Sequence, residues 1–143
     1  MGRQRSRKRR GRPVTGILLL DKPTDLSSNK ALQQAKYLYF ANKAGHTGSL
    51  DPLATGLLPL CFGEATKFSQ FLLDADKAYQ TTIVLGASST TEDADGELEF
   101  IASAENITQS EVLAATKDML GEQLQVPPMY SALKQNGRRL YDL

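Results

Sequence analysis

Strand-like and helix-like segments follow one another along this chain in an irregular order. Residues 16–21 are almost wholly aliphatic, as in a buried strand, whereas residues 27–40 repeat apolar side chains at helical spacing after three residues suited to capping a helix. A regular alternation of strand and helix would predict a doubly wound parallel sheet, and this order lacks one. The sequence therefore predicts an α+β fold with a mixed, mainly antiparallel sheet and flanking helices.

The elements predicted after residue 40 share the same uneven spacing. In chain order they begin with a short strand at 57–62, a helix at 65–73 and a β-branched strand at 79–85. A polar loop at 88–96 and a return strand at 98–101 follow. A capping box formed by Thr108 and Glu111 then predicts the start of a helix that ends near Gly121. Cys61 stands alone in an apolar run, so it predicts a small buried residue and excludes an internal disulfide.

Positive charge is concentrated at the start of the chain. Seven of the 17 basic residues fall within residues 3–12, and the ten that follow face 16 acids, so the rest of the chain carries a net charge of −6. We expect a basic flexible arm at residues 1–13 and one domain over residues 14–143. Such an arm suits contacts with nucleic-acid phosphates, and it equally suits a solvated terminus. Because no closing element follows the basic stretch near residues 134–139, we expect the domain to stop part-way.

Several classes of protein are disfavoured by what the sequence lacks. No apolar run approaches the roughly 20 residues that cross a bilayer, and no signal-peptide core is present, so the expected compartment is the cytoplasm. The only histidine, His46, has no partners at metal-ligand spacing. We therefore expect no metal and no cofactor.

The segment 45–56 is the richest in chemistry. Its glycines are not followed by the Lys-Ser/Thr pair of a phosphate-binding loop, and its Ser49 lacks the surroundings of a hydrolase nucleophile. What remains is a lone carboxylate, Asp51. Pro52 biases the backbone of Asp51 toward an extended conformation, and Gly48 allows the backbone to approach a ligand closely. A carboxylate can act as a covalent nucleophile, whereas the spacing alone favours an Asp-Pro turn or the start of a helix.

This segment, Gly-His-Thr-Gly-Ser-Leu-Asp-Pro-Leu-Ala-Thr-Gly, resembles the catalytic loop of the bacterial tRNA pseudouridine-55 synthases, the TruB family. Four other blocks extend the resemblance in the same order, at residues 16–23, 63–68, 76–79 and 128–134. The resemblance covers nearly the whole chain after the arm. It implies a pseudouridine synthase catalytic fold, of which this chain is the N-terminal portion.

The resemblance implies an isomerase that converts one uridine in the T-loop of tRNA to pseudouridine after flipping the base out of its stack. Asp51 would be the nucleophile, attacking either ribose C1′ or uracil C6. Tyr79 would stack on the flipped uracil, and His46 would fill the space that the base leaves. The expected partner is the tRNA T-arm stem-loop, the expected state is a monomer, and Lys22 with Pro23 would support the catalytic loop.

The chain also departs from the family pattern. Lys43 and Gln80 stand where the family often has arginine, and the family's later blocks, with a second active-site tyrosine, a basic partner for the nucleophile and an RNA-binding module, are absent. The isolated chain is therefore expected to be inactive by itself. The alternative function is a tRNA-binding or tRNA-folding module without turnover.

Overall fold

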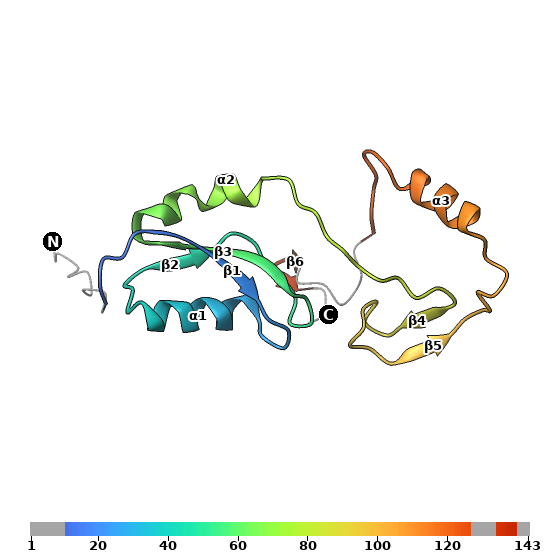
Figure 1. Ribbon diagram of the computed structural model, residues 1–143, viewed down its shortest axis with the longest axis horizontal. Coiled ribbons are helices and arrows are strands. Elements are labelled where there is room, and N and C mark those ends of the chain that lie inside the picture. The colour runs from blue at the N-terminus through green and yellow to red at the C-terminus, as the bar shows by residue number, and fades with distance from the viewer. Residues whose placement is uncertain (1–10, 127–133, 140–143) are drawn as a thin grey trace. The chain divides into compact units, whose positions relative to one another are not determined.

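The apolar strand β3 (Gly56–Phe62) organises the first part of the chain. In the computed structural model, which describes residues 11–126 and 134–139, β3 is the central strand of a three-stranded sheet in the order β1–β3–β2 (Figure 1). The strand β1 (Gly16–Lys22) pairs with it along its full length, and β2 (Ala44–His46) pairs with the other edge. The sequence predicts strands at residues 16–21 and 57–62, and both predictions are confirmed.

The pairing fixes where the candidate catalytic loop begins and ends. Both outer strands run antiparallel to β3, with Lys22 opposite Gly56 and His46 opposite Leu60. The loop 47–55, which joins β2 to β3, therefore returns to the end of the sheet at which β1 stops. This arrangement brings the residues after β1 next to the loop, although the two segments are about 30 residues apart in sequence.

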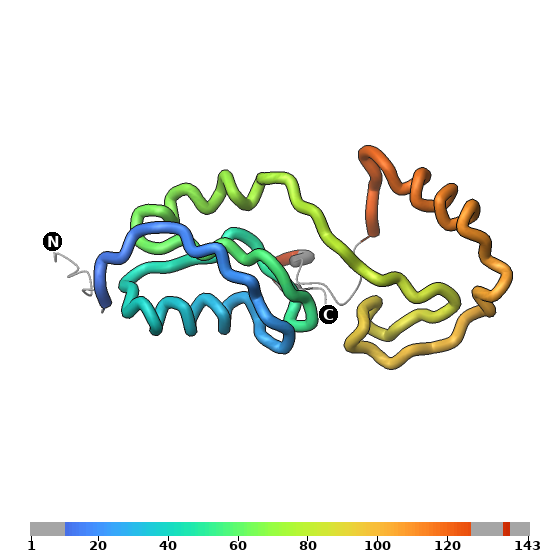
Figure 2. Tube along the Cα trace, in the orientation of Figure 1, coloured from blue at the N-terminus to red at the C-terminus, as the bar shows by residue number. Residues whose placement is uncertain are grey.

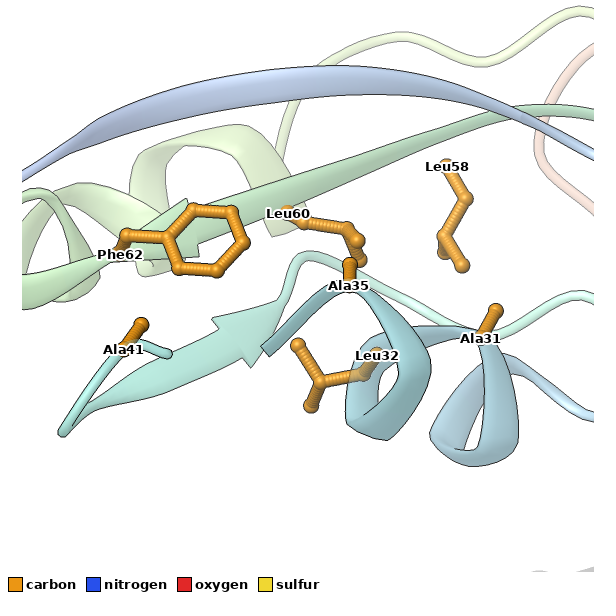
Figure 3. Packing of buried hydrophobic residues seen from close by; sticks show 7 residues of the cluster. All are labelled: Ala31, Leu32, Ala35, Ala41, Leu58, Leu60 and Phe62. Carbon is orange, nitrogen blue, oxygen red and sulfur yellow. The ribbon is translucent and has the colours of Figure 1, made fainter. Parts of the chain in front are cut away.

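The helix α1 (Ser28–Leu38) covers one face of this sheet. Ser27 is its N-cap, with an extended backbone and a side chain that accepts a hydrogen bond from the Lys30 N–H at 3.3 Å. Alanines on the inward face allow the helix backbone to approach the strands closely. The resulting core, seen in Figure 3, joins residues of the helix, the turn after it and β3: Ala31, Leu32, Ala35, Ala41, Leu58, Leu60 and Phe62. The predicted helix is thus confirmed, with Ser27 as its N-cap.

The helix ends in a Schellman motif. The N–H of Ala41 donates to the carbonyl of Lys36 at 2.9 Å, and the N–H of Phe40 donates to that of Tyr37 at 2.9 Å. This closure places Phe40 in the left-handed region with φ of 48°. Glycine usually occupies such a position, because a Cβ atom disfavours this backbone conformation. A phenylalanine at this position is therefore strained.

The strain predicts an opposite response at two neighbouring positions. Changing Phe40 to Gly should give a free energy of unfolding about 1 kcal/mol higher than changing it to Ala, because only glycine adopts this backbone freely. The same pair of changes at Tyr37, exposed inside the helix, should favour Ala by about the same amount. Urea unfolding followed by circular dichroism compares the four variants. Equal midpoints for the two Phe40 variants would contradict the strain.

After β3 the chain turns through two short helices. A 3-10 helix, η1 (Gly63–Phe68), runs directly into α2 (Ser69–Leu73). The predicted helix at 65–73 is present, although its first half is more tightly wound than an α-helix. No residue of α2 is buried, and Phe68 and Phe71 pack ring to ring at 6.4 Å between centroids.

The described residues cluster into two units, Met1–Tyr79 and Gln80–Leu143, where the sequence predicts one domain after the arm. The second unit contains the hairpin of β4 (Ala87–Ser89) and β5 (Leu98–Phe100), followed by α3 (Gln109–Asp118); Figure 2 traces the chain through them. Thr108 and Glu111 form the predicted capping box, which confirms the start of α3. No residue of α3 is buried.

A further hairpin closes the described part of the second unit. It pairs β6 (Lys134–Gln135) with β7 (Arg138–Arg139) around Asn136 and Gly137, which have φ of 53° and 83°. Two successive positive φ angles suit the Asn-Gly turn that favours hairpins. This hairpin lies within the basic stretch, for which no strand is predicted.

The prediction of a strand at residues 79–85 is also wrong. The chain is irregular from Asp76 to Val84, and the side chains from Tyr79 to Leu85 are exposed. Alternating β-branched residues favour a strand only when a neighbouring strand supplies hydrogen bonds and packing. Within the part of the chain that the structure describes, no strand pairs with this segment.

Candidate active site

Asp51 lies in the middle of the loop 47–55, at the end of the sheet where β1 stops. Its side chain is exposed, and within residues 11–126 and 134–139 its carboxylate forms no hydrogen bond and no ion pair. Its carbonyl accepts from the Ala54 N–H at 3.1 Å, which closes a turn over Pro52. The backbone of this turn is therefore held by a hydrogen bond, while the carboxylate has no hydrogen-bond partner among the described residues.

A buried lysine ties the end of β1 to this loop. Lys22 is 0% exposed, and its ammonium group donates to the carbonyls of Leu26 at 2.7 Å, Pro23 at 2.9 Å and Pro52 at 3.3 Å. An ammonium has three N–H donors, so these three carbonyls use all of them. One of the three belongs to the residue directly after Asp51.

The segment after Lys22 adds further contacts on the same side of the loop. The Asp25 N–H donates to the Pro52 carbonyl at 2.8 Å, and the Thr24 hydroxyl donates to the Leu53 carbonyl at 3.4 Å. Asp25 has a left-handed backbone with φ of 61°, which aspartate tolerates better than most residues. Pro52 and Leu53 are therefore fixed by their main-chain oxygens.

On the other side of Asp51, one side chain holds both polar groups of Leu50. The Ser28 hydroxyl donates to the Leu50 carbonyl at 2.9 Å, and the Leu50 N–H donates back to the Ser28 oxygen at 2.8 Å. Ser28 is 4% exposed and opens α1. The residues that flank Asp51 are thus tethered on both sides by four residues, which we name the loop cradle: Lys22, Thr24, Asp25 and Ser28.

Gly48 supplies the conformation that the start of the loop needs. Its φ is 118°, outside the range of L side chains. A Cβ atom there would lie 3.9 Å from Leu73 Cδ2, which is ordinary contact, so space would permit a side chain and the backbone would not.

His46 directly precedes the loop 47–55, whereas Tyr79 forms no hydrogen bond with this loop among the described residues. His46 ends β2 and is half-buried, and its Nδ1 atom is buried without a hydrogen-bond partner among the described residues. Tyr79 lies on the irregular segment after α2 and is 73% exposed. In the described ranges no hydrogen bond connects Tyr79 with His46 or Asp51.

Cys61 is a poor competitor for the role of nucleophile. It lies fully buried in β3, and this burial raises the pKa of its thiol, so the reactive thiolate is disfavoured. The pKa values of Glu64, Asp93 and Glu111 are lowered, each chiefly by a hydrogen bond to a neighbouring side chain. All three carboxylates lie outside the loop.

Two kinds of feature are absent from the described ranges. Among these residues no group of three or more His, Cys, Asp or Glu side chains could hold a metal ion. No helix in the same ranges is long and apolar enough to span a membrane.

Lys22, which the family resemblance expects to support the loop, does bond to it, whereas the sequence predicts no such contact for Ser28. Residues 27–29 are all predicted helix caps, and Ser27 is the one that caps the helix. A hydrogen bond between residues 22 positions apart leaves no local signal in the sequence.

Comparisons with known proteins place this loop in a family. The family described as "TruB family pseudouridylate synthase (N terminal domain)" matches residues 36–143. The tRNA pseudouridine synthase B of Saccharophagus degradans is 59% identical over 138 residues, which cover 96% of this chain and 44% of that protein. Its counterpart in Methylobacillus flagellatus is 61% identical over 134 residues, or 94% of this chain and 44% of that protein.

The agreement extends to a third relative. The tRNA pseudouridine synthase B of Neisseria gonorrhoeae is 60% identical over 131 residues, covering 92% of this chain and 42% of that protein. The chain therefore spans less than half the length of these relatives. The family match takes in the loop with Asp51, the irregular segment with Tyr79 and the whole second unit. This chain belongs to the TruB family of pseudouridylate synthases and corresponds to its N-terminal domain.

Proposed function

We propose that this chain carries the nucleophile of an enzyme that isomerises the T-loop uridine of tRNA to pseudouridine. The observation that carries the proposal is the state of Asp51: an exposed carboxylate without a partner among the described residues, on a loop tethered on both sides. A nucleophile needs a free oxygen and a fixed position, and this arrangement supplies both. The relatives' names supply the substrate class, tRNA.

In the proposed reaction, the main task of the protein is to position the nucleophile and the uridine. The N1–C1′ bond of the uridine breaks, a C5–C1′ bond forms, and the proton at C5 is released as N1 gains one. Substrate and product have the same composition, so the reaction consumes no oxidant, reductant or second substrate. Asp51 would hold the uracil or the ribose covalently while the base turns. We accordingly propose a reaction without metal or cofactor.

The base must leave its stack before Asp51 can reach it, and His46 and Tyr79 suit that step. A ring at the end of β2 can occupy the space that the extruded base leaves, and an exposed tyrosine can stack on the base itself. The proposed partner is the T-arm stem-loop, bound by a monomer in the cytoplasm, where tRNA is available.

The stacking role predicts different outcomes for two changes at Tyr79. Phe keeps the aromatic face and should bind tRNA as the parent does, whereas Leu should weaken binding by about tenfold and slow turnover, since stacking of one base contributes about 1–3 kcal/mol. Filter binding measures the first effect and tritium release from tRNA labelled at uracil C5 measures the second. Tyr37→Leu, at another exposed tyrosine, is the control. A Tyr79→Leu variant that turns over at the parent rate would refute the stacking role.

The alternative function is tRNA binding without turnover; the chain spans 44% or less of the three relatives compared above. The two functions differ in a single assay. We expect the 143-residue chain to release no tritium from labelled tRNA. We expect a chimera, in which residues 1–143 replace the matching part of the Saccharophagus degradans enzyme, to release it in the presence of a chelator. A chimera that binds tRNA without releasing tritium would favour the binding module.

A further inference from the structure

The geometry around Leu50 points to a role for Ser28 that its place in the helix does not explain. Ser28 is the first residue of α1, and the neighbouring Ser27 already provides the N-cap by accepting from the Lys30 N–H. The Ser28 hydroxyl instead makes two hydrogen bonds to Leu50, at 2.9 Å and 2.8 Å.

These two bonds act on the residue before Asp51. Leu50 is not part of a strand, so its N–H and its carbonyl lack ladder partners. A single serine oxygen, 4% exposed, satisfies both and thereby fixes the orientation of the peptide that leads into Asp51. The residue that follows Asp51 is held independently, because the Pro52 carbonyl accepts hydrogen bonds from Lys22 and from the Asp25 N–H.

We propose that Ser28 is a positioning residue for Asp51, which acts through Leu50 to aim the carboxylate at its target. With only the Pro52 side held, the backbone at Asp51 could swing about the free side, and the carboxylate would lose its direction. An error of about 1 Å in the position of a reacting group can cost about a hundredfold in rate. The inference rests on the proposed function, since it assigns a task to a residue that serves Asp51.

The test compares two adjacent serines in the chimera. Ser28→Ala should lower the single-turnover rate of tritium release by about 10- to 100-fold while leaving the Kd for tRNA within about twofold of the parent. Ser27→Ala removes the helix cap, lowers the Tm, and should leave the rate within about twofold. A fall in rate confined to Ser28→Ala supports positioning. Equal rates for Ser28→Ala and the parent, or equal falls for both serines, would overturn it.

A second measurement does not depend on activity, and its first part uses the parent chain alone. In the 143-residue chain, the Leu50 amide should exchange its hydrogen slowly, because its partner is the buried Ser28 oxygen. Ser28→Ala should remove this protection, and Ser27→Ala should retain it. Rapid exchange of the Leu50 amide in the parent chain would overturn the proposal by itself.

The outcomes also separate this inference from the proposed function. If the parent chimera is inactive, or if Asp51→Asn retains the rate, the proposed function fails. If the parent is active, Asp51→Asn is inactive and Ser28→Ala turns over at the full rate, only the positioning role fails.

Discussion

Asp51→Asn is expected to abolish isomerisation in the chimera, lowering the rate of tritium release by on the order of 10⁴-fold or more, as loss of a reacting group does in other enzymes. The amide has nearly the shape of the carboxylate but cannot form the covalent bond. Since the carboxylate is exposed and has no partner among the described residues, its replacement should disturb neither folding nor tRNA affinity. Tritium release, filter binding and thermal unfolding measure the three effects.

Asp25 offers a matched control for this change. It lies in the loop cradle, and it contacts the catalytic loop through its backbone N–H to Pro52, which Asp25→Asn leaves in place. Asparagine also tolerates the left-handed backbone at this position. We expect Asp25→Asn to retain at least about half of the parent rate. Near-normal release by Asp51→Asn would remove the nucleophile assignment, whatever the control does.

The parts of the fold that could be predicted are those determined by short stretches of sequence. The aliphatic run of β1, the capping serine of α1 and the capping box of α3 each carry their information within a few residues. The turn at Asn136 and Gly137 carries an equally local signal for a hairpin.

The failed prediction of a strand at 79–85 has a different origin. A helix satisfies its own backbone, whereas a strand depends on a neighbour that the local pattern does not reveal. The segment has the alternation and the β-branched residues of a strand, and its side chains are exposed without a paired partner in the described chain.

The candidate site divides in the same way. Asp51 stands out in the sequence as a lone carboxylate among glycines and a proline, and only the family resemblance favours a nucleophile over an Asp-Pro turn there. The support for it could not be read, because the bonds from Lys22 and Ser28 to the loop join residues 30 and 22 positions apart. Such contacts exist only once β1 and β3 pair in their observed register.

Lys22 is expected to be the most important single side chain for the stability of the first unit. Lys22→Ala removes the ammonium that three carbonyls share and leaves a cavity where a fully buried side chain stood. Pro52 keeps the N–H of Asp25, whereas the carbonyls of Pro23 and Leu26 lose the bonds that Lys22 donates to them. The free energy of unfolding should fall by about 3 kcal/mol or more, from the lost hydrogen bonds and the cavity together.

Lys22→Met separates the two contributions, because methionine has a similar length and apolar stem without the donors. It fills the cavity and removes the cost of burying a charge, so its loss of stability should be well below that of Lys22→Ala. Its effect on turnover should nevertheless be large, since the bond from Lys22 to Pro52 beside Asp51 is lost in both variants. Urea unfolding should rank the stability of the parent highest, then Lys22→Met, then Lys22→Ala, and tritium release by the chimera measures turnover.

The control is Lys30→Ala, at an exposed lysine on α1, which should change neither stability nor turnover by much. Unfolding of Lys22→Ala at the parent's urea midpoint would show that the three bonds contribute no net stability, and a fully active Lys22→Met would show that Asp51 is positioned without them.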